Sequence, residues 1–251
     1  MDQPLHLLVA DDHLVNQILV RALLEAMGHR VDVVSDGRRA VEAVGASTYD
    51  LVLMDMRMPE MDGLAATRAI RALPAPAGTI PILALTANSD GADIRSCRAA
   101  GMNGFLPKPV SSAELARAIA SVLEGHGAPA SGVSRTSGEK LFDRSVLDRL
   151  AEDLGPGRLP DMLEKIGAET ARRLVVLRRL AQSGEPTAIQ FEAHALKGTA
   201  ATVGLVSLAA LAKRLERDAA TLAASELATA IDEVEAAYGA GWPLVTANSK
   251  R

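Results

Sequence analysis

Three aspartates that could bind a metal ion or accept a phosphoryl group each follow a short apolar run. Asp11 and Asp12 come after residues 5–10. Asp55 comes after residues 51–54. Both runs predict buried strands, and neighbouring parallel strands bring the residues at their carboxyl ends to one edge of a sheet. Carboxylates about 4 Å apart repel by roughly 4 kcal/mol at an effective dielectric of 20. A hard divalent cation such as Mg²⁺, which prefers oxygen ligands, would offset this repulsion.

A hydroxyl group and an ammonium group follow two further predicted strands. Thr86 ends the apolar segment 80–86, and Lys108 follows the segment 104–107. A carboxylate, a metal ion, a hydroxyl and a cation around one point suit phosphoryl transfer, which depends on positioning and charge neutralisation. Taken singly, each of these residues is an ordinary loop or surface residue. Their occurrence at four strand ends favours one shared site.

The elements that must position these side chains follow from the hydrophobic pattern of residues 1–124. Strand-like and helix-like segments alternate, which predicts an α/β domain with a doubly wound five-stranded parallel sheet. The expected strands are 5–10, 30–34, 50–55, 80–86 and 104–107, and the expected helices are 15–27, 37–46, 64–72, 94–100 and 113–123.

The second half of the chain has a different pattern. Small residues and prolines without a period predict a flexible linker at 125–140. Apolar residues at helical spacing then predict an all-α four-helix-bundle domain at 141–243. Trp242-Pro243 suggests the end of the last helix, with a frayed tail at 244–251.

One histidine of the predicted bundle has neighbours that favour chemistry. His194, Lys197 and Gly198 have the spacing of one helical face. A glycine inside a helix costs about 1 kcal/mol relative to alanine, and clearance for an incoming active site would explain it. A neutral imidazole nitrogen can attack phosphorus, and the lysine would favour the added negative charge. The alternative is an ordinary surface histidine.

The strand ends of the first half resemble the motifs of response-regulator receiver domains, which have a flavodoxin-like fold. The matching segments are Leu8-Val9-Ala10-Asp11-Asp12, Asp55-Met56-Arg57-Met58-Pro59-Glu60-Met61-Asp62-Gly63, Leu85-Thr86-Ala87 and Lys108-Pro109. The resemblance covers about half of the chain and implies that Asp55 is the phospho-acceptor. Asp11-Asp12-His13-Leu14-Val15-Asn16 is similar to receivers attached to hybrid histidine kinases.

The same resemblance implies roles for the surrounding residues. Asp12, Asp55 and the backbone carbonyl of Arg57 would bind Mg²⁺, and Asp11 would orient a water on the metal. Lys108 would pair with the phosphoryl oxygens, and Thr86 would bond one of them when the domain switches. Phe105 occupies the position of the family's aromatic switch, although a plain core aromatic explains it equally well.

The segment 193–204 is similar to the motif of histidine phosphotransfer domains, and the match extends over roughly residues 141–240. This resemblance implies that His194 carries phosphate, with Lys197 and Gly198 in support. A group of basic residues on the next predicted helix is a candidate docking rim, but a solvated helix face explains it better. The group consists of Lys213, Arg214 and Arg217.

Composition and the absence of some sequence motifs exclude several classes of function. The net charge of −4 argues against nucleic-acid binding. A single cysteine, Cys97, fits a reducing compartment. The start of the chain has no signal-peptide pattern, and no apolar run reaches 18 residues, so we expect a cytoplasmic protein without membrane contact. No ATP-binding motif is present, so whether the chain is an enzyme stays open: it would be a phosphotransfer intermediate without a kinase core.

These observations favour a two-component phosphorelay protein. A sensor histidine kinase would act upstream, and another receiver domain or response regulator downstream. One alternative is the C-terminal segment of a hybrid sensor kinase, and another is a phosphorylation-switched binding or inhibitory module. A phosphatase with an aspartate nucleophile is disfavoured, because that nucleophile follows the first strand whereas the best acceptor here follows the third.

Overall fold

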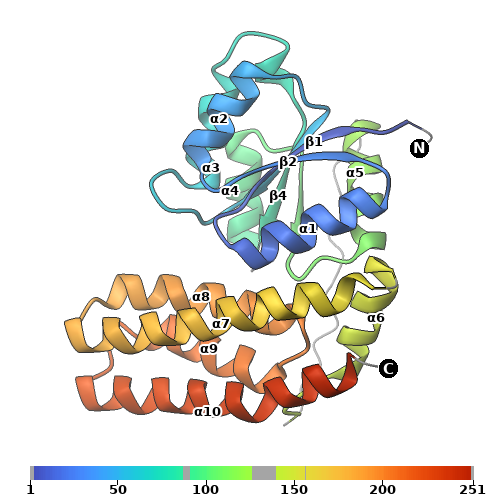
Figure 1. The fold of residues 1–251 in the computed structure, drawn as a ribbon. Helices are drawn as coiled ribbons and strands as arrows, with labels where there is room; N and C mark the ends of the chain where they lie inside the picture. Colours follow the sequence, from blue (N-terminus) through green and yellow to red (C-terminus); the bar gives the residue numbers. More distant parts are fainter. Residues whose placement is uncertain (1–2, 87–90, 126–139, 156, 250–251) are drawn as a thin grey trace. The chain divides into compact units, whose positions relative to one another are not determined.

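The computed structural model describes residues 3–86, 91–125, 140–155 and 157–249. The chain divides between residues 135 and 136 into two compact units (Figure 1). This division falls inside the segment 125–140, most of which lies outside the described residues. Each unit has its own core and is considered by itself.

The described part of the first unit contains one five-stranded parallel sheet. Its strands are β1 (His6–Ala10), β2 (Arg30–Val34), β3 (Leu51–Asp55), β4 (Ile82–Thr86) and β5 (Gly104–Pro107). They lie in the order β2-β1-β3-β4-β5. The doubly wound parallel sheet expected from the sequence is therefore confirmed. The first and third strands are neighbours, as the site requires.

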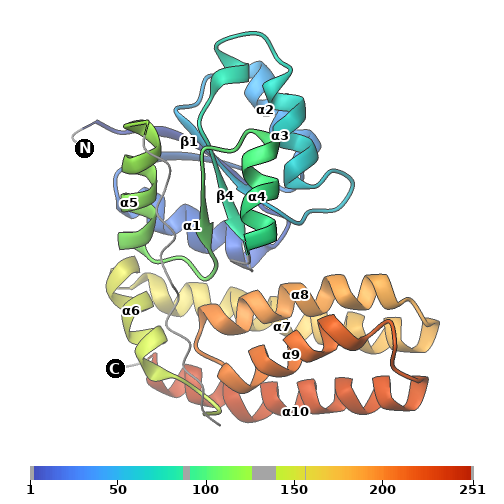
Figure 2. The same cartoon turned by 180° about the vertical axis from the view of Figure 1, so that it is seen from behind.

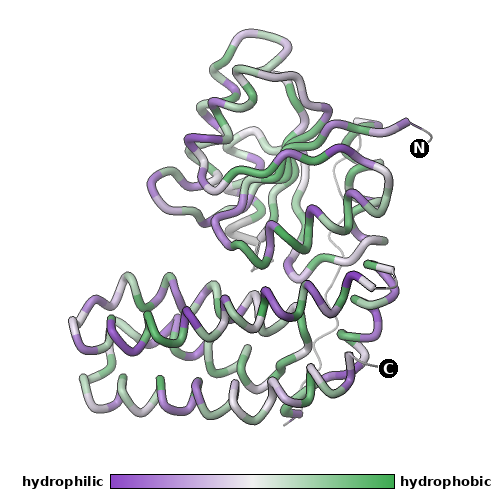
Figure 3. Tube along the Cα trace, in the orientation of Figure 1, coloured by the Kyte–Doolittle hydropathy of each residue, from purple (hydrophilic) through white to green (hydrophobic). Residues whose placement is uncertain are grey.

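Helices cover both faces of this sheet. They are α1 (Leu14–Ala26), α2 (Gly37–Ala46), α3 (Gly63–Arg71), α4 (Gly91–Ala100) and α5 (Ser112–Leu123), with a short 3₁₀ helix at Ala77–Thr79. Figures 1 and 2 show α1 and α5 on one face and α2, α3 and α4 on the other. All residues of β3 and β4 are buried, which explains their continuous apolar runs. Figure 3 shows the central strands as the most hydrophobic part of this unit.

Local side chains set where several elements begin. The Asp62 carboxylate caps α3 by accepting the Ala65 N–H at 2.7 Å. Ser111 and Glu114 form a capping box at the start of α5. The fourth strand begins two residues later than the pattern suggested, because the Ile80 N–H donates to Ala77 and closes the 3₁₀ helix.

The second unit is helical throughout its described residues. Its helices are α6 (Arg144–Leu154), α7 (Arg158–Ser183), α8 (Pro186–Thr202), α9 (Val206–Asp218) and α10 (Ala224–Asn248). Helix α7 contacts α8, α8 contacts α9, α9 contacts α10, and α10 contacts α7, so these four helices form the expected bundle. Helix α6 packs on α7 and α10.

The last helix differs from the sequence expectation. We expected fraying from residue 244 onward, but α10 continues through Pro243 to Asn248. Two contacts explain this. Val245 is fully buried, and a Cβ at Gly241 would lie 2.6 Å from Leu205 Cδ2, so the end of α10 packs closely on the bundle. Within the described ranges, no helix is both long and apolar enough to cross a membrane.

Candidate functional site

The carboxyl ends of three strands bring two aspartates and a lysine together. Ala10 of β1 pairs with Met54 of β3, so Asp11 and Asp55 come next in register. Lys108, directly after β5, places its Nζ 2.7 Å from Asp11 Oδ2 and 2.8 Å from Asp55 Oδ2. Both aspartates are buried, and the lysine side chain is 10% exposed. One ammonium group therefore bridges two buried carboxylates.

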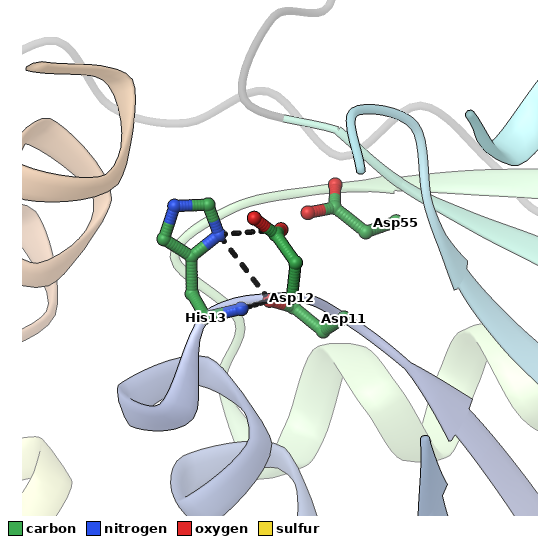
Figure 4. Close-up of side chains that lie close together, drawn as sticks. All are labelled: Asp11, Asp12, His13 and Asp55. Atoms are coloured by element: carbon green, nitrogen blue, oxygen red, sulfur yellow. Dashed lines mark hydrogen bonds and ion pairs between the residues drawn. The ribbon is translucent and has the colours of Figure 1, made fainter. Parts of the chain in front are cut away.

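Asp12 and His13 complete this cluster, as Figure 4 shows. The His13 Nδ1 atom lies 2.7 Å from Asp12 Oδ1 and 3.6 Å from Asp11 Oδ1. The backbone N–H of His13 donates to Asp11 Oδ1 at 2.9 Å. We did not single out His13 from the sequence, because its spacing from other residues matches no metal-ligand pattern. Its position directly after Asp11-Asp12 was the available signal.

The titratable groups of the cluster have pKa values that are shifted in different directions. Burial raises the pKa of Asp55 to about 6, although Lys108 acts in the opposite direction. Burial also acts to raise the pKa of Asp11, but Lys108 and His13 hold it well below its usual value. Burial would lower the pKa of His13, but the neighbouring carboxylates of Asp11 and Asp12 raise it to about 9. Asp11 is therefore ionised, whereas the ionised form of Asp55 is destabilised and would be favoured by a further cation nearby.

The donor set fits a hard divalent cation. One ligand atom each from Asp11, Asp12, His13 and Asp55 lies within 4.8 Å of the others. The loop 56–62 turns back over Asp55, and a Cβ at Gly63 would lie 2.1 Å from the Asp55 carbonyl oxygen. The glycine of the Asp62-Gly63 pair is thus required for this close approach.

Thr86, Arg57 and Phe105 lie on the elements around the cluster. Thr86 ends β4 with its side chain buried, and its carbonyl oxygen accepts the Lys108 N–H at 2.7 Å. Arg57 is exposed in the loop after β3. Phe105 is 5% exposed and belongs to the core cluster that includes Cys97 and Met102. It is therefore seen as a core aromatic, and its switching role stays a prediction.

The second candidate site is centred on His194 of α8. Its Nδ1 atom lies 2.8 Å from Glu216 Oε1 of α9. The other carboxylate oxygen of Glu216 accepts from Lys197 Nζ at 2.6 Å, and this Nζ lies 3.4 Å from His194 Nδ1. The three side chains form one compact group. A Cβ added at Gly198 would meet nothing within 4 Å, so the backbone there is open, as its proposed clearance role requires.

Glu216 was not predicted from the sequence. It lies on a different helix from the histidine, next to Leu215 in the polar side of the α9 pattern, so nothing local marks it. Burial would raise its pKa, but hydrogen bonds from His194 and Lys197 outweigh this effect and hold the pKa well below its usual value. Glu216 is therefore ionised and accepts a hydrogen bond from the imidazole.

The basic residues of α9 have local partners. Arg214 pairs with Glu233, and the Arg217 guanidinium pairs with Asp218 at 2.6 Å. Lys213 is exposed. These contacts are typical of a solvated helix face, the interpretation we preferred for this group.

Comparison with known proteins identifies both units. The family model of the response regulator receiver domain matches residues 7–120, and that of the Hpt domain matches residues 161–238. The chain is 33% identical to the sensory/regulatory protein RpfC of Xanthomonas campestris pv. campestris over 220 residues, which cover 85% of this chain and 30% of RpfC. It is 31% identical to the aerobic respiration control sensor protein ArcB of Escherichia coli K12 over 215 residues, which cover 84% of this chain and 28% of ArcB.

A solved receiver domain is also similar. The receiver domain of the sensor histidine kinase PA1611 from Pseudomonas aeruginosa PAO1, which has a magnesium ion in its active-site cleft, is 41% identical. The alignment covers 49% of this chain and 99% of that one, with a TM-score of 0.46. The chain spans less than a third of the length of RpfC and ArcB. With a receiver domain at 7–120 followed by an Hpt domain at 161–238, the chain belongs to the phosphorelay proteins of two-component signalling.

Proposed function

We propose that Asp55 accepts a phosphoryl group from a phosphohistidine and that His194 carries phosphate to or from a receiver aspartate. The observation that carries this proposal is that one chain contains both a buried carboxylate beside a lysine, in the first unit, and an imidazole oriented by a carboxylate, in the second. Asp55 is 2% exposed and shares one lysine with Asp11. His194 is held by a carboxylate through its Nδ1 atom.

At the receiver site, a carboxylate oxygen of Asp55 attacks phosphorus, and the phosphorus–nitrogen bond of the donor breaks. Lys108 already lies 2.8 Å from Asp55 Oδ2 and pairs with the oxygens of the incoming group. Thr86 donates its hydroxyl to one of these oxygens, and Phe105 follows this change from the core. Asp12, Asp55 and the backbone carbonyl of Arg57 would hold Mg²⁺, and Asp11 would orient a water on it. The metal would supply charge neutralisation at the transferred group.

At the Hpt site, Glu216 determines which nitrogen reacts. A carboxylate only accepts hydrogen bonds, so the contact at 2.8 Å places the imidazole proton on Nδ1. The Nε2 atom then carries the lone pair that attacks phosphorus, and the phosphorus–oxygen bond of the donor phosphoaspartate breaks. The product is a phosphorylated ring that keeps its Nδ1 proton and is positive, and Glu216 stabilises that charge. Lys197 holds Glu216 in place, and Gly198 leaves room for the donor.

The relatives suggest the partners. RpfC, ArcB and the sensor protein GacS of Pseudomonas syringae are sensory or regulatory proteins. We propose a sensor histidine kinase upstream and another receiver domain or response regulator downstream. Since the matches to RpfC and ArcB cover less than a third of those proteins, we further propose that this region functions as the relay portion of a hybrid sensor kinase. Its cytoplasmic location stays a prediction.

The test uses the purified chain, Mg²⁺ and acetyl phosphate as phosphodonor. Phosphorylation is followed by intact mass and by lability, since acyl phosphate is lost in alkali whereas phosphohistidine survives alkali and is lost in acid. We expect alkali-labile label that disappears in Asp55→Asn. Alkali-stable label that requires both Asp55 and His194 would show transfer within the chain. If Asp55 never acquires phosphate, the proposal is wrong for the first unit, and a binding or inhibitory module takes its place.

A further inference from the structure

The side chain of His13 has no part in the phosphoryl chemistry proposed above, yet it lies inside the cluster. It is 2% exposed, and its Nδ1 atom is 2.7 Å from Asp12 Oδ1. Figure 4 shows the Asp12 carboxylate between the His13 ring and Asp55. The oxygen of Asp12 that faces the ring is itself buried and accepts no hydrogen bond from the described residues, so its contact with the ring is an ion pair. The ring therefore contacts one oxygen of this carboxylate from the side opposite Asp55.

The backbone of His13 fixes the second acid of the pair. Its N–H donates to Asp11 Oδ1 at 2.9 Å, and the Asn16 amide donates to the same oxygen at 3.2 Å. Residue 13 thus contacts both aspartates, through its main chain in one case and its ring in the other. This arrangement resembles the outer contacts that orient carboxylate ligands around metal ions.

We propose that His13 is a positioning residue for Mg²⁺: its ring holds one oxygen of Asp12 so that the other is presented to the ion. This inference rests on the proposed metal site. The 2.7 Å contact between His13 Nδ1 and Asp12 Oδ1 and the burial of the ring carry this inference.

The first experiment measures Mg²⁺ affinity of the full chain by isothermal titration calorimetry at fixed pH and ionic strength. His13→Leu keeps a side chain of similar shape but removes the donor, and we expect 10- to 100-fold weaker binding, the usual cost of losing such a contact. His13→Asn keeps an N–H donor at the position of Nδ1, and we expect affinity close to that of the wild type. His29→Leu removes a histidine of the same unit outside the cluster and is the matched control.

The outcomes separate this inference from the proposed function. If Asp12→Asn and Asp55→Asn bind Mg²⁺ as the wild type does, the proposed metal site itself is wrong. If those variants lose binding but His13→Leu binds normally or more tightly, the metal site stands and the positioning role of His13 is wrong. Circular dichroism checks that each variant is folded.

A measurement on the unaltered chain makes the result independent of folding defects. The nitrogen resonances of the His13 ring, recorded by NMR with saturating Mg²⁺, report which nitrogen is protonated. We expect a protonated Nδ1. A ring whose Nδ1 carries no proton in the Mg²⁺-bound chain would overturn the inference, because it could not donate to Asp12.

Discussion

The two proposed phosphate-carrying sites balance their charges in opposite ways. At the strand ends, Asp11, Asp12 and Asp55 face Lys108 and His13, and burial raises the pKa of Asp55 to about 6. On the bundle, the single carboxylate of Glu216 lies 2.6 Å from Lys197 Nζ and 2.8 Å from His194 Nδ1. Negative charge is therefore in excess at the first site, whereas one carboxylate and one ammonium group balance each other at the second. This difference predicts that a metal ion, or a substitution that removes a negative charge, affects the stability of the first site more than that of the second.

The largest expected effect is on the stability of the metal-free receiver. At pH 8, Asp55→Asn should raise its free energy of unfolding by up to roughly 3 kcal/mol, since each pKa unit corresponds to about 1.4 kcal/mol and the Asp55 pKa rises from 3.8 to about 6. A raised carboxyl pKa makes the unfolded state lose its proton first. The loss of wild-type stability caused by ionised Asp55 thus grows between about pH 4 and pH 6, is full above pH 6, and is absent below pH 4. Differential scanning calorimetry at pH 8 and pH 4 measures it.

Glu42→Gln is the control for this experiment, because it removes the same charge from an exposed position on α2. It should leave the receiver transition nearly unchanged. Adding Mg²⁺ should raise the wild-type transition, reduce the advantage of Asp55→Asn and leave the bundle transition in place. If Asp55→Asn destabilises the metal-free receiver at pH 8, the repulsion that distinguishes the two sites is absent.

The next effect concerns the carboxylate that orients His194. With phosphoramidate as donor on an Asp55→Asn background, Glu216→Ala should slow phosphorylation of His194 by about 10- to 100-fold, a typical cost of losing an orienting contact. The product should also change, because without Glu216 the ring proton is no longer held on Nδ1. NMR of the phosphorylated chain should show phosphate on Nε2 in the wild type and on both nitrogens in Glu216→Ala.

Glu216→Gln sharpens the same comparison, since its amide oxygen still accepts from Nδ1. We expect a single product at a rate between those of the wild type and Glu216→Ala. Because the Glu216 pKa is lowered, its ionised form stabilises the bundle above about pH 4.5, and this contribution falls as the pH drops further. Equal rates for all three proteins would show that Glu216 serves bundle stability alone.

Sequence reasoning succeeded where one element carries the whole signal. The apolar runs that end at Ala10 and Met54 located β1 and β3, and adjacency in a doubly wound sheet then brought Asp11 and Asp55 together. Reasoning from the sequence missed contacts that depend on side-chain orientation or on a second helix. His13 joins the cluster because its ring turns back toward Asp12, and Glu216 reaches His194 only through the packing of α9 on α8.

The end of α10 was misjudged for a related reason. Pro243 lacks an N–H, and this local cost predicted a stop. The burial of Val245 and the close approach of Gly241 to Leu205 are tertiary contacts that outweigh it. Periodicity within one segment gives no information about such contacts, so the boundary could be found only in the structure.

The smallest expected effect tests the clearance beside His194. A Cβ at Gly198 meets no atom within 4 Å, and alanine is favoured over glycine inside a helix by about 1 kcal/mol. Gly198→Ala should therefore stabilise the bundle by about that amount, as measured by urea unfolding followed through the fluorescence of the single tryptophan, Trp242. Phosphate transfer from a receiver should nevertheless become slower, because the added methyl group occupies the space that the donor needs.

Gly239→Ala is the matched control, since a Cβ added at this glycine of α10 would also meet nothing within 4 Å, and the residue lies on another helix from His194. It should stabilise the bundle similarly and leave transfer unchanged. Phosphorylation by phosphoramidate, a small donor, should be normal in both variants, because one methyl group obstructs a protein partner more than a small molecule. If Gly198→Ala gains stability and transfers phosphate from a receiver at the wild-type rate, the open backbone at this position has no role in docking, and His194 with Glu216 and Lys197 would suffice for the site.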